Sequence, residues 1–140
     1  VSREKVSLLQ ILEQIRRYML QTLLPSARRV TIHVGGEDVI VSADCASSVA
    51  LVVNELVQNA LKYAFPSGQA GRIGIELHSG RPLCQLTVWD NGVGFQADRP
   101  RPGGAGLELA STIVREKLTG EWSVESGPGG TRISFDFLEQ

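Results

Sequence analysis

Residues 54–66 have the sequence NELVQNALKYAFP and follow the apolar run VALVV at residues 49–53. The apolar residues recur at helical spacing, which predicts one helix that begins near Asp44 as its N-cap and runs to about Ala64. At about 100° per residue, four polar side chains in the middle of this helix fall within about 100° of arc. They are Glu55, Gln58, Asn59 and Lys62.

The polar stripe of this helix has two interpretations. Binary patterning alone predicts a solvent-exposed face. Asn59, however, is a poor helix former, because its amide competes for backbone hydrogen bonds, and its carbonyl oxygen is a ligand that suits Mg²⁺. Glu55 lies about one turn earlier, where it can orient a nucleophile or a metal-bound water, and Lys62 lies almost one turn later, within reach of a phosphate. The stripe therefore also indicates a magnesium–nucleotide site.

Around this helix, hydrophobic periodicity predicts an order of helix, two strands, helix, two strands, glycine-rich loop, helix and two strands. A first helix spans about residues 6–23, with Ser2 or Ser7 as its N-cap, and RRVTIHV (28–34) and DVIVSA (38–43) are predicted to form a hairpin. Hairpins separated by single helices predict a mixed, largely antiparallel sheet with helices on one face. The later elements are strands at 71–79 and 83–90, a helix at 107–118 closed by Gly120, and strands at 121–127 and 131–139.

A second motif, VWDNGVGF, begins where a predicted strand ends. Thr87 and Trp89 are predicted to point outward from this strand, and Asp90 terminates it. A carboxylate here can accept a hydrogen bond from an exocyclic amine, and Gly92 and Gly94 allow the backbone to approach a flat ligand. Asp-Asn-Gly is also an ordinary turn sequence, so the motif alone leaves both interpretations open.

Two glycine-rich segments complete the pattern. GGAGLELA (103–110) leads directly into a predicted helix, where backbone N–H groups and the helix dipole form an anion site without net positive charge. It is not a P-loop, because no Gly-Lys-Ser/Thr follows, and it is not a dinucleotide fingerprint, because the preceding strand ends well before it. GPGGT (127–131) is either a plain hairpin loop or a further part of the site.

Composition limits the class of protein. The chain has 140 residues, 42% of them hydrophobic and 21% charged, with a net charge of −1, as is ordinary for one soluble domain. Without a basic tract, nucleic acid is not an expected partner, and no apolar run approaches the roughly 20 residues needed to span a bilayer. Cys45 and Cys84 are predicted to be small buried hydrophobes in a reducing compartment, with a metal site or a disulfide as alternatives.

The order and spacing of these motifs resemble the ATP-binding domain of the GHKL superfamily, which includes gyrase, Hsp90, MutL and sensor histidine kinases. Residues 54–66 most resemble two-component sensor histidine kinases of the HisKA_2/HWE type. The resemblance covers nearly the whole chain and implies a two-layer α/β sandwich, the Bergerat fold, with a mixed and mostly antiparallel sheet covered by helices on one face. It implies that residues 1–140 form one ATP-binding catalytic domain with ATP and Mg²⁺ as cofactors.

Position by position, the resemblance implies roles for individual residues. Asn59 would coordinate Mg²⁺, Glu55 would support the water or general-base position, and Lys62 would contact phosphate. Asp90 would bind the adenine amino group, and residues 95–103 would form the ATP lid. The remaining nucleotide contacts would fall on Tyr63, Gly92, Gly94, Gly104, Gly106, Leu107 and Thr131. The lid departs from the family pattern, since it is short and rich in Pro and Arg.

The activity implied is transfer of the γ-phosphate of ATP to a histidine on a separate dimerisation domain of the same kinase, with a response regulator downstream. This module would be cytoplasmic, with no direct membrane contact and no nucleic-acid partner. His33 and His78 both lie in strand-like segments, so neither is predicted to be the phosphoacceptor. The chain would then be a fragment of a longer kinase, with residues 1–24 adjoining the missing phosphoacceptor region. The alternatives are a serine kinase of the anti-sigma-factor type on the same fold, and a non-catalytic nucleotide-binding module.

Overall fold

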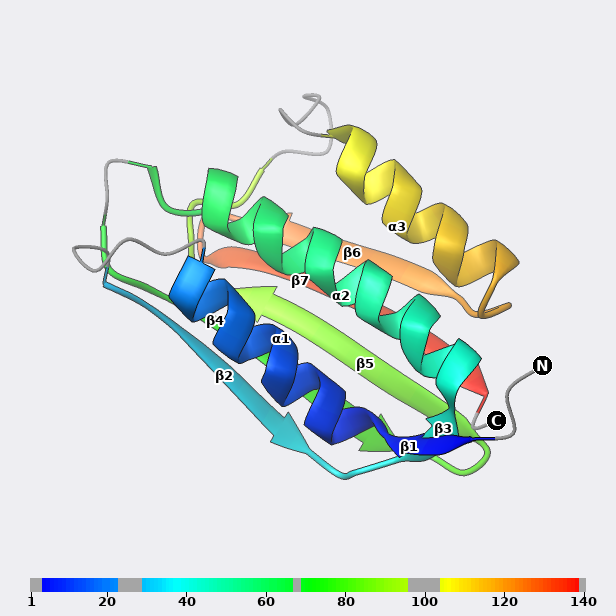
Figure 1. Ribbon diagram of the computed structural model, residues 1–140. Helices are drawn as coiled ribbons and strands as arrows, with labels where there is room; N and C mark the ends of the chain where they lie inside the picture. The colour runs from blue at the N-terminus through cyan, green and yellow to red at the C-terminus, as the bar shows by residue number, and fades with distance from the viewer. Residues whose placement is uncertain (1–3, 23–28, 67–68, 96–103, 139–140) are drawn as a thin grey trace.

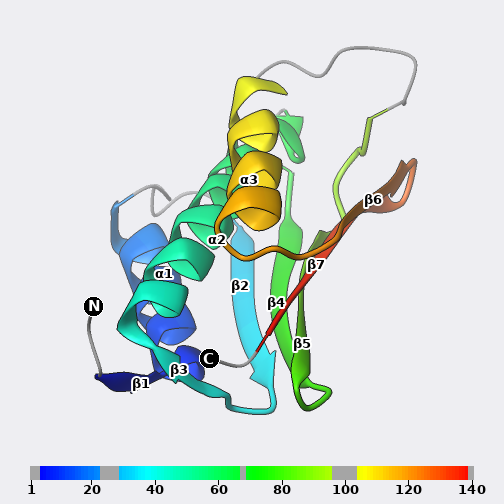
Figure 2. The same ribbon diagram turned by 90° about the vertical axis from the view of Figure 1, so that its right-hand side faces the viewer.

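The computed structural model describes residues 4–22, 29–66, 69–95 and 104–138. It forms two layers, a twisted sheet and three helices that cover one of its faces (Figures 1 and 2). The elements in chain order are β1 (Lys5–Ser7), α1 (Leu8–Thr22), β2 (Val30–Gly36), β3 (Ile40–Ser42), α2 (Ala43–Tyr63), β4 (Gly71–Ser79), β5 (Leu83–Asp90), α3 (Gly104–Glu116), β6 (Trp122–Gly127) and β7 (Gly130–Leu138). The predicted fold class is confirmed.

The main sheet has five strands in the order β2-β4-β5-β7-β6. Strands β2 and β4 are parallel, and the other neighbours are antiparallel. A parallel pair needs a crossover connection, and α2 supplies it between β2 and β4. The strands at 71–79 and 83–90 occupy the predicted residues.

The hydrophobic core lies between the sheet and the helices. Alternate residues of each strand enter it, as Leu86 and Val88 do from β5, and α2 contributes the largest buried helix face. Trp89 is on the uncovered face of the sheet, as predicted, where its indole donates to Glu76 Oε1 at 3.2 Å. Thr87 shares that face but is only 4% exposed, because it packs in the sheet centre with its hydroxyl 3.0 Å from Ser134 Oγ.

The predicted hairpin of residues 28–34 and 38–43 is wrong. Strand β2 pairs with β4, whereas β3 leaves the main sheet and pairs antiparallel with β1 in a separate two-stranded sheet. Gly36 turns the chain at a φ of 109°, and a Cβ there would meet the carbonyl oxygen of Leu77. Val39 and Val41 are then buried under the helices, and β3 leads directly into α2. Both valines thus join the core although β3 lies outside the main sheet.

The helix boundaries also differ from prediction. Helix α1 begins at Leu8, because Val6 is part of β1, and Ser7 Oγ accepts from the N–H of Gln10 at 3.2 Å. The N-cap of α2 is Ser42 and not Asp44, since the Ser42 hydroxyl accepts from the N–H of Cys45 at 3.1 Å. Ser2, the other predicted N-cap, and residue 23, the predicted end of this helix, lie outside the described residues.

Both cysteines are buried and free, as predicted, and burial raises the pKa of the Cys45 thiol to about 11. No helix in the described part of the chain is long and apolar enough to cross a bilayer.

Asp38 fixes the start of α1 from a distant point in the sequence. Its carboxylate accepts from Ser7 Oγ at 2.7 Å and from the N–H groups of Leu9 and Val39 at 3.0 and 2.8 Å. Burial acts to raise the pKa of Asp38, but these hydrogen bonds outweigh it and lower the pKa below its ordinary value. The ionised carboxylate is therefore favoured in the folded protein.

Replacement of Asp38 by alanine is expected to lower the free energy of unfolding by about 1 kcal/mol near neutral pH, as loss of a helix cap does. Because the folded-state pKa is depressed, the contribution is complete above the unfolded-state pKa of about 3.9 and is lost as pH falls through the folded-state value. Urea unfolding from neutral to acid pH should show the parent and variant converging. Glu37→Ala, an exposed neighbouring acid, is the control; an Asp38→Ala variant as stable as Glu37→Ala at neutral pH would contradict this assignment.

Candidate functional site

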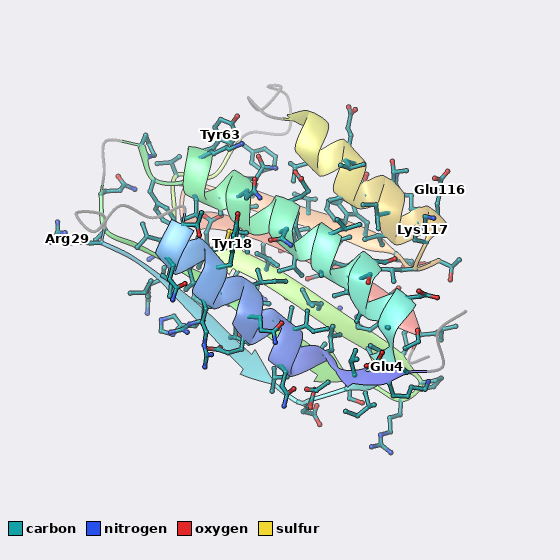
Figure 3. All side chains as sticks on the ribbon, in the orientation of Figure 1. Glu4, Tyr18, Arg29, Tyr63, Glu116 and Lys117 are labelled. Atoms are coloured by element: carbon teal, nitrogen blue, oxygen red, sulfur yellow. The ribbon has the colours of Figure 1, made fainter. Side chains whose placement is uncertain are left out.

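Four segments with the predicted motifs meet at one end of the molecule. They are the end of α2, the end of β5, the start of α3 and the turn between β6 and β7 (Figures 1 and 2). Tyr63, in the last turn of α2, lies at this end on the side of the start of α3 (Figure 3). The fold thus gathers segments that are distant in sequence around a common site.

Asn59 is the central polar residue of the α2 segment. It is only 6% exposed, and its Nδ2 has no hydrogen-bond partner among the described residues. A buried amide without a partner costs about 1–3 kcal/mol, so native proteins seldom retain one without a reason. The unsatisfied amide supports the interpretation of Asn59 as a ligand-binding residue and weighs against a solvated face.

The other polar residues of the predicted stripe do not share the environment of Asn59. Glu55 is half-buried one turn earlier, whereas Lys62 is exposed and makes no ion pair with another described residue. Gln58 instead lines a separate hollow with Asn54 and residues of α1. The stripe is therefore not one surface, because α1 packs along one border of it and α3 along the other.

Asp90 ends β5 on the face of the sheet that the helices cover. Its side chain is 8% exposed, and its Oδ1 accepts from the N–H of Gly92 at 2.9 Å. Asn91, next in sequence, continues the pairing with β4, because its Oδ1 accepts from the N–H of Arg72 at 2.7 Å. These hydrogen bonds fix the position of the Asp90 carboxylate at the end of β5.

Gly92 and Gly94 allow close packing within the protein itself. A Cβ on Gly92 would lie 2.2 Å from the carbonyl oxygen of Ala64, the C-cap of α2, and that oxygen accepts from the N–H of Val93 at 2.9 Å. Gly94 has a φ of 68°, and a Cβ there would meet the carbonyl oxygen of Gly127. The two glycines therefore let the loop after β5 pack against the protein backbone itself, which joins α2, β5 and β6 at the site.

Thr131 faces the site beside Asp90, since the two residues are direct partners in the pairing of β5 with β7. Its side chain is 5% exposed, and its Oγ1 lies 2.8 Å from Ser126 Oγ. Ser126 Oγ also accepts from the N–H of Phe95 at 2.8 Å. Ser126 is not among the residues that the sequence predicts for the site, because no periodicity distinguishes it from other polar residues of an edge strand.

Helix α3 begins at Gly104, three residues before the predicted start, so Gly104 and Gly106 belong to its first turn. The first turn contains no acidic residue, which leaves the positive end of the helix dipole available to an anion. Leu107 is half-buried and lines a hollow of 400 Å³ between α3 and β6 with Phe95 and Trp122. Residues 96–103, most of the predicted lid, lie outside the described residues.

The residues at the site fit a magnesium–nucleotide ligand chemically. The carboxamide of Asn59 can present a carbonyl oxygen to a cation or an N–H to a phosphate oxygen, depending on its last torsion. The Asp90 carboxylate is an acceptor for an amine, and Thr131 offers a hydroxyl next to it. Among the described residues, no three His, Cys, Asp or Glu side chains gather into a metal-binding group.

The comparisons with known proteins agree with this arrangement. Residues 45–140 match the family described as "Histidine kinase-, DNA gyrase B-, and HSP90-like ATPase". Blue-light-activated histidine kinase 2 of Erythrobacter litoralis is 31% identical over 112 residues, which cover 76% of this chain and 32% of that protein. Sensor histidine kinase PdtaS of Mycobacterium tuberculosis is 27% identical over 120 residues, which cover 84% of this chain and 24% of that protein.

A solved structure shares the fold closely. The histidine kinase domain of the blue-light-activated kinase EL346 of Erythrobacter litoralis superposes with a TM-score of 0.80 at 26% identity, and the match covers 94% of this chain and 65% of that one. Serine-protein kinase RsbW of Listeria innocua is also similar, 28% identical over 89 residues that cover 52% of this chain and 57% of that protein. The chain spans about a quarter to a third of the sensor kinases that it matches.

Proposed function

The chain belongs to the family of histidine kinase-, DNA gyrase B- and HSP90-like ATPases, and from that premise we propose that it is the catalytic domain of a protein histidine kinase. It binds Mg·ATP and delivers the γ-phosphate to a histidine on a separate dimerisation domain of the same protein. The observation that carries this proposal is the buried N–H₂ group of Asn59, which lacks an acceptor among the described residues, lies at the end of the molecule where Asp90 and Thr131 lie, and would be satisfied by a phosphate oxygen. Residues 1–140 act as one catalytic module.

Each residue of the site has a distinct task in this proposal. Asp90 accepts from the exocyclic amine of adenine, while Thr131 contacts the base beside it, directly or through water. Asn59 would hold the metal through its carbonyl oxygen and donate from Nδ2 to a phosphate oxygen, the metal would neutralise phosphate charge, and the exposed ammonium of Lys62 reaches a phosphate. Phosphoryl transfer is governed by positioning and charge neutralisation, so these contacts supply most of what the domain contributes.

The remaining predicted residues frame these contacts. Glu55 orients a water or the incoming acceptor from one turn before Asn59, and Tyr63 flanks the nucleotide. Gly104, Gly106 and Leu107 direct the N–H groups of the first turn of α3 toward the phosphates. Gly92 and Gly94 keep the loop after Asp90 packed against α2 and β6.

The partners and place of action follow from this chemistry. The first partner is the dimerisation domain that carries the acceptor histidine, and the second is a response regulator that receives the phosphoryl group from it. Neither nucleic acid nor direct membrane contact has a role, and the domain works in the cytoplasm.

Phosphate transfer can be tested with ATP labelled at the γ-phosphate. The chain alone is expected to bind ATP without labelling itself, because His33 and His78 lie on the sheet face opposite to the side chain of Asp90. A longer chain of the same protein that includes the dimerisation domain is expected to acquire an acid-labile label on a histidine of that domain. Label at His33 or His78 of the short chain would overturn the proposal, and the long chain with Asn59→Ala is the control that should remain unlabelled.

A second candidate function is serine phosphorylation, which is supported by the similarity to serine-protein kinase RsbW. The same assay separates the two, because phosphoserine is stable to acid and phosphohistidine is not. An acid-stable label on a separate protein substrate would favour the serine kinase. A chain that binds ATP but transfers phosphate in neither setting would favour a non-catalytic nucleotide-binding module.

A further inference from the structure

The hydroxyl group of Ser126 contacts two hydrogen-bonding groups at the end of the proposed site where the nucleobase would bind. Its Oγ lies 2.8 Å from the backbone nitrogen of Phe95 and 2.8 Å from Thr131 Oγ1. Thr131 is nine-tenths buried, and it pairs directly with Asp90 across β5 and β7. Ser126 itself pairs with Thr131 across β6 and β7. The backbone of Phe95 is thereby linked through two hydroxyl groups to the position beside the Asp90 carboxylate.

The direction of the hydrogen bond between the two hydroxyls matters, because each has one proton. The Phe95 N–H must donate, so Ser126 Oγ accepts it. If Ser126 then donates to Thr131, a continuous chain runs from N–H to hydroxyl to hydroxyl, and the Thr131 proton is available to the site. Such chains strengthen cooperatively, because each donor polarises the next. In the reverse direction Ser126 accepts twice, and Thr131 presents only lone pairs to the site.

We infer that Ser126 is a specificity-determining positioning residue, which fixes the Thr131 hydroxyl as a hydrogen-bond donor toward a ring nitrogen of the purine. This inference rests on the proposed function, in which the site binds the base of ATP. Residues directly opposite each other on one face of an antiparallel pair have Cβ atoms about 4.5–5.5 Å apart. Asp90 and Thr131 can therefore contact neighbouring positions on one edge of a base, Asp90 as acceptor and Thr131 as donor.

An acceptor beside a donor matches adenine, whose exocyclic amine donates and whose adjacent ring nitrogens accept. On the edge that carries N1, guanine presents a carbonyl acceptor and a ring N–H donor, so both contacts would be mismatched, whereas N7 is an acceptor in both purines. If Thr131 faces N1, the polarity of the Ser126–Thr131 bond is thus part of what distinguishes the two purines. Without Ser126, the Thr131 hydroxyl is free to rotate, and its donor role is no longer imposed.

The chain offers a matched control for the Ser126–Thr131 pair. Ser134 also forms a hydroxyl pair with a threonine, Thr87, at a distance of 3.0 Å. This pair links β5 and β7 in mid-sheet on the face opposite to the Asp90 side chain, and it does not contact the proposed site. Ser134→Ala therefore removes the same kind of bond without touching the base contacts.

The test uses calorimetric titration of the full chain with ATP and with its deaza analogues, in which carbon replaces one of the ring nitrogens beside the amine. The parent should bind ATP more tightly than the analogue that lacks the ring nitrogen contacted by Thr131. Ser126→Ala should weaken ATP binding about fivefold, the effect of one hydrogen bond. The same substitution should leave the binding of that analogue unchanged, because the analogue has no acceptor for the Thr131 hydroxyl. Ser126→Thr should restore the parent affinity, and Ser134→Ala should equal the parent for every ligand.

Equal weakening of ATP and of the discriminated analogue by Ser126→Ala would show a merely structural role and overturn the inference, as would parent-like ATP binding by that variant. A parent that binds ATP and every deaza analogue equally would show that Thr131 donates to no ring nitrogen, which also overturns it while leaving the proposed function intact. A parent that binds no adenine nucleotide would instead refute the proposed function, and the inference with it.

Discussion

Replacement of Asn59 by alanine is expected to lower the affinity for Mg·ATP on the order of a hundredfold while the fold stays as stable as before. Loss of a contact to a charged group is worth up to about 3 kcal/mol, which corresponds to roughly a hundredfold in binding. In the free protein the Nδ2 of Asn59 has no partner among the described residues, so its removal also removes a desolvation cost. The free energy of unfolding should therefore stay within about 1 kcal/mol of the parent value, or rise.

Titration with ATP in the presence and absence of Mg²⁺, together with urea unfolding, measures both effects. Asn54→Ala is the matched control, because Asn54 lies on the same helix toward α1 and its amide donates to the carbonyl oxygen of Ala50 at 3.0 Å. That variant should bind Mg·ATP like the parent and lose about 1 kcal/mol of stability. An Asn59→Ala variant that retains the magnesium-dependent gain in ATP affinity would show that Asn59 does not bind the metal.

Replacement of Asp90 by asparagine is expected to reduce ATP affinity by about tenfold to a hundredfold and to erase the preference for ATP over GTP. Asparagine has the same shape and can keep the bond from the Gly92 N–H to Oδ1, so the strand end should be preserved. The other carboxylate oxygen becomes an N–H₂ donor, which opposes the amine of adenine. A site that binds an amine through a buried acceptor discriminates strongly against ligands without that amine, because the acceptor is then left unpaired.

Asp136→Asn provides the same chemical change elsewhere in the sheet. Asp136 lies toward the other end of β7, where its Oδ1 accepts from the N–H of Glu121 at 2.7 Å. That variant should keep the parent affinity for ATP and the parent preference over GTP, both measured by competition titration. Parent protein that binds GTP as tightly as ATP, or an Asp90→Asn variant with unchanged ATP affinity, would remove Asp90 from the base contact.

Local sequence patterns were sufficient for much of the architecture after residue 42. Alternation of apolar residues located β4 and β5, because a strand with one buried face has a period of two. Helical periodicity located α2, and the glycine clusters located the turns and the start of α3 to within three residues. The combination of four motifs in order led to the correct family, although each motif alone also had an ordinary structural interpretation.

Only the tertiary structure decided which of several locally similar residues serve the site. Asn59 and Gln58 are adjacent in one polar stripe, yet Asn59 is buried at the site and Gln58 lies in a hollow beside α1, because helices distant in sequence pack on either border of α2. In the same way, β3 pairs with β1 and not with its neighbour β2. Ser126 meets Phe95 across 31 positions of the chain. Periodicity indicates which side of a helix or strand is buried. Which other element packs against that side depends on long-range contacts, which a local sequence pattern does not specify.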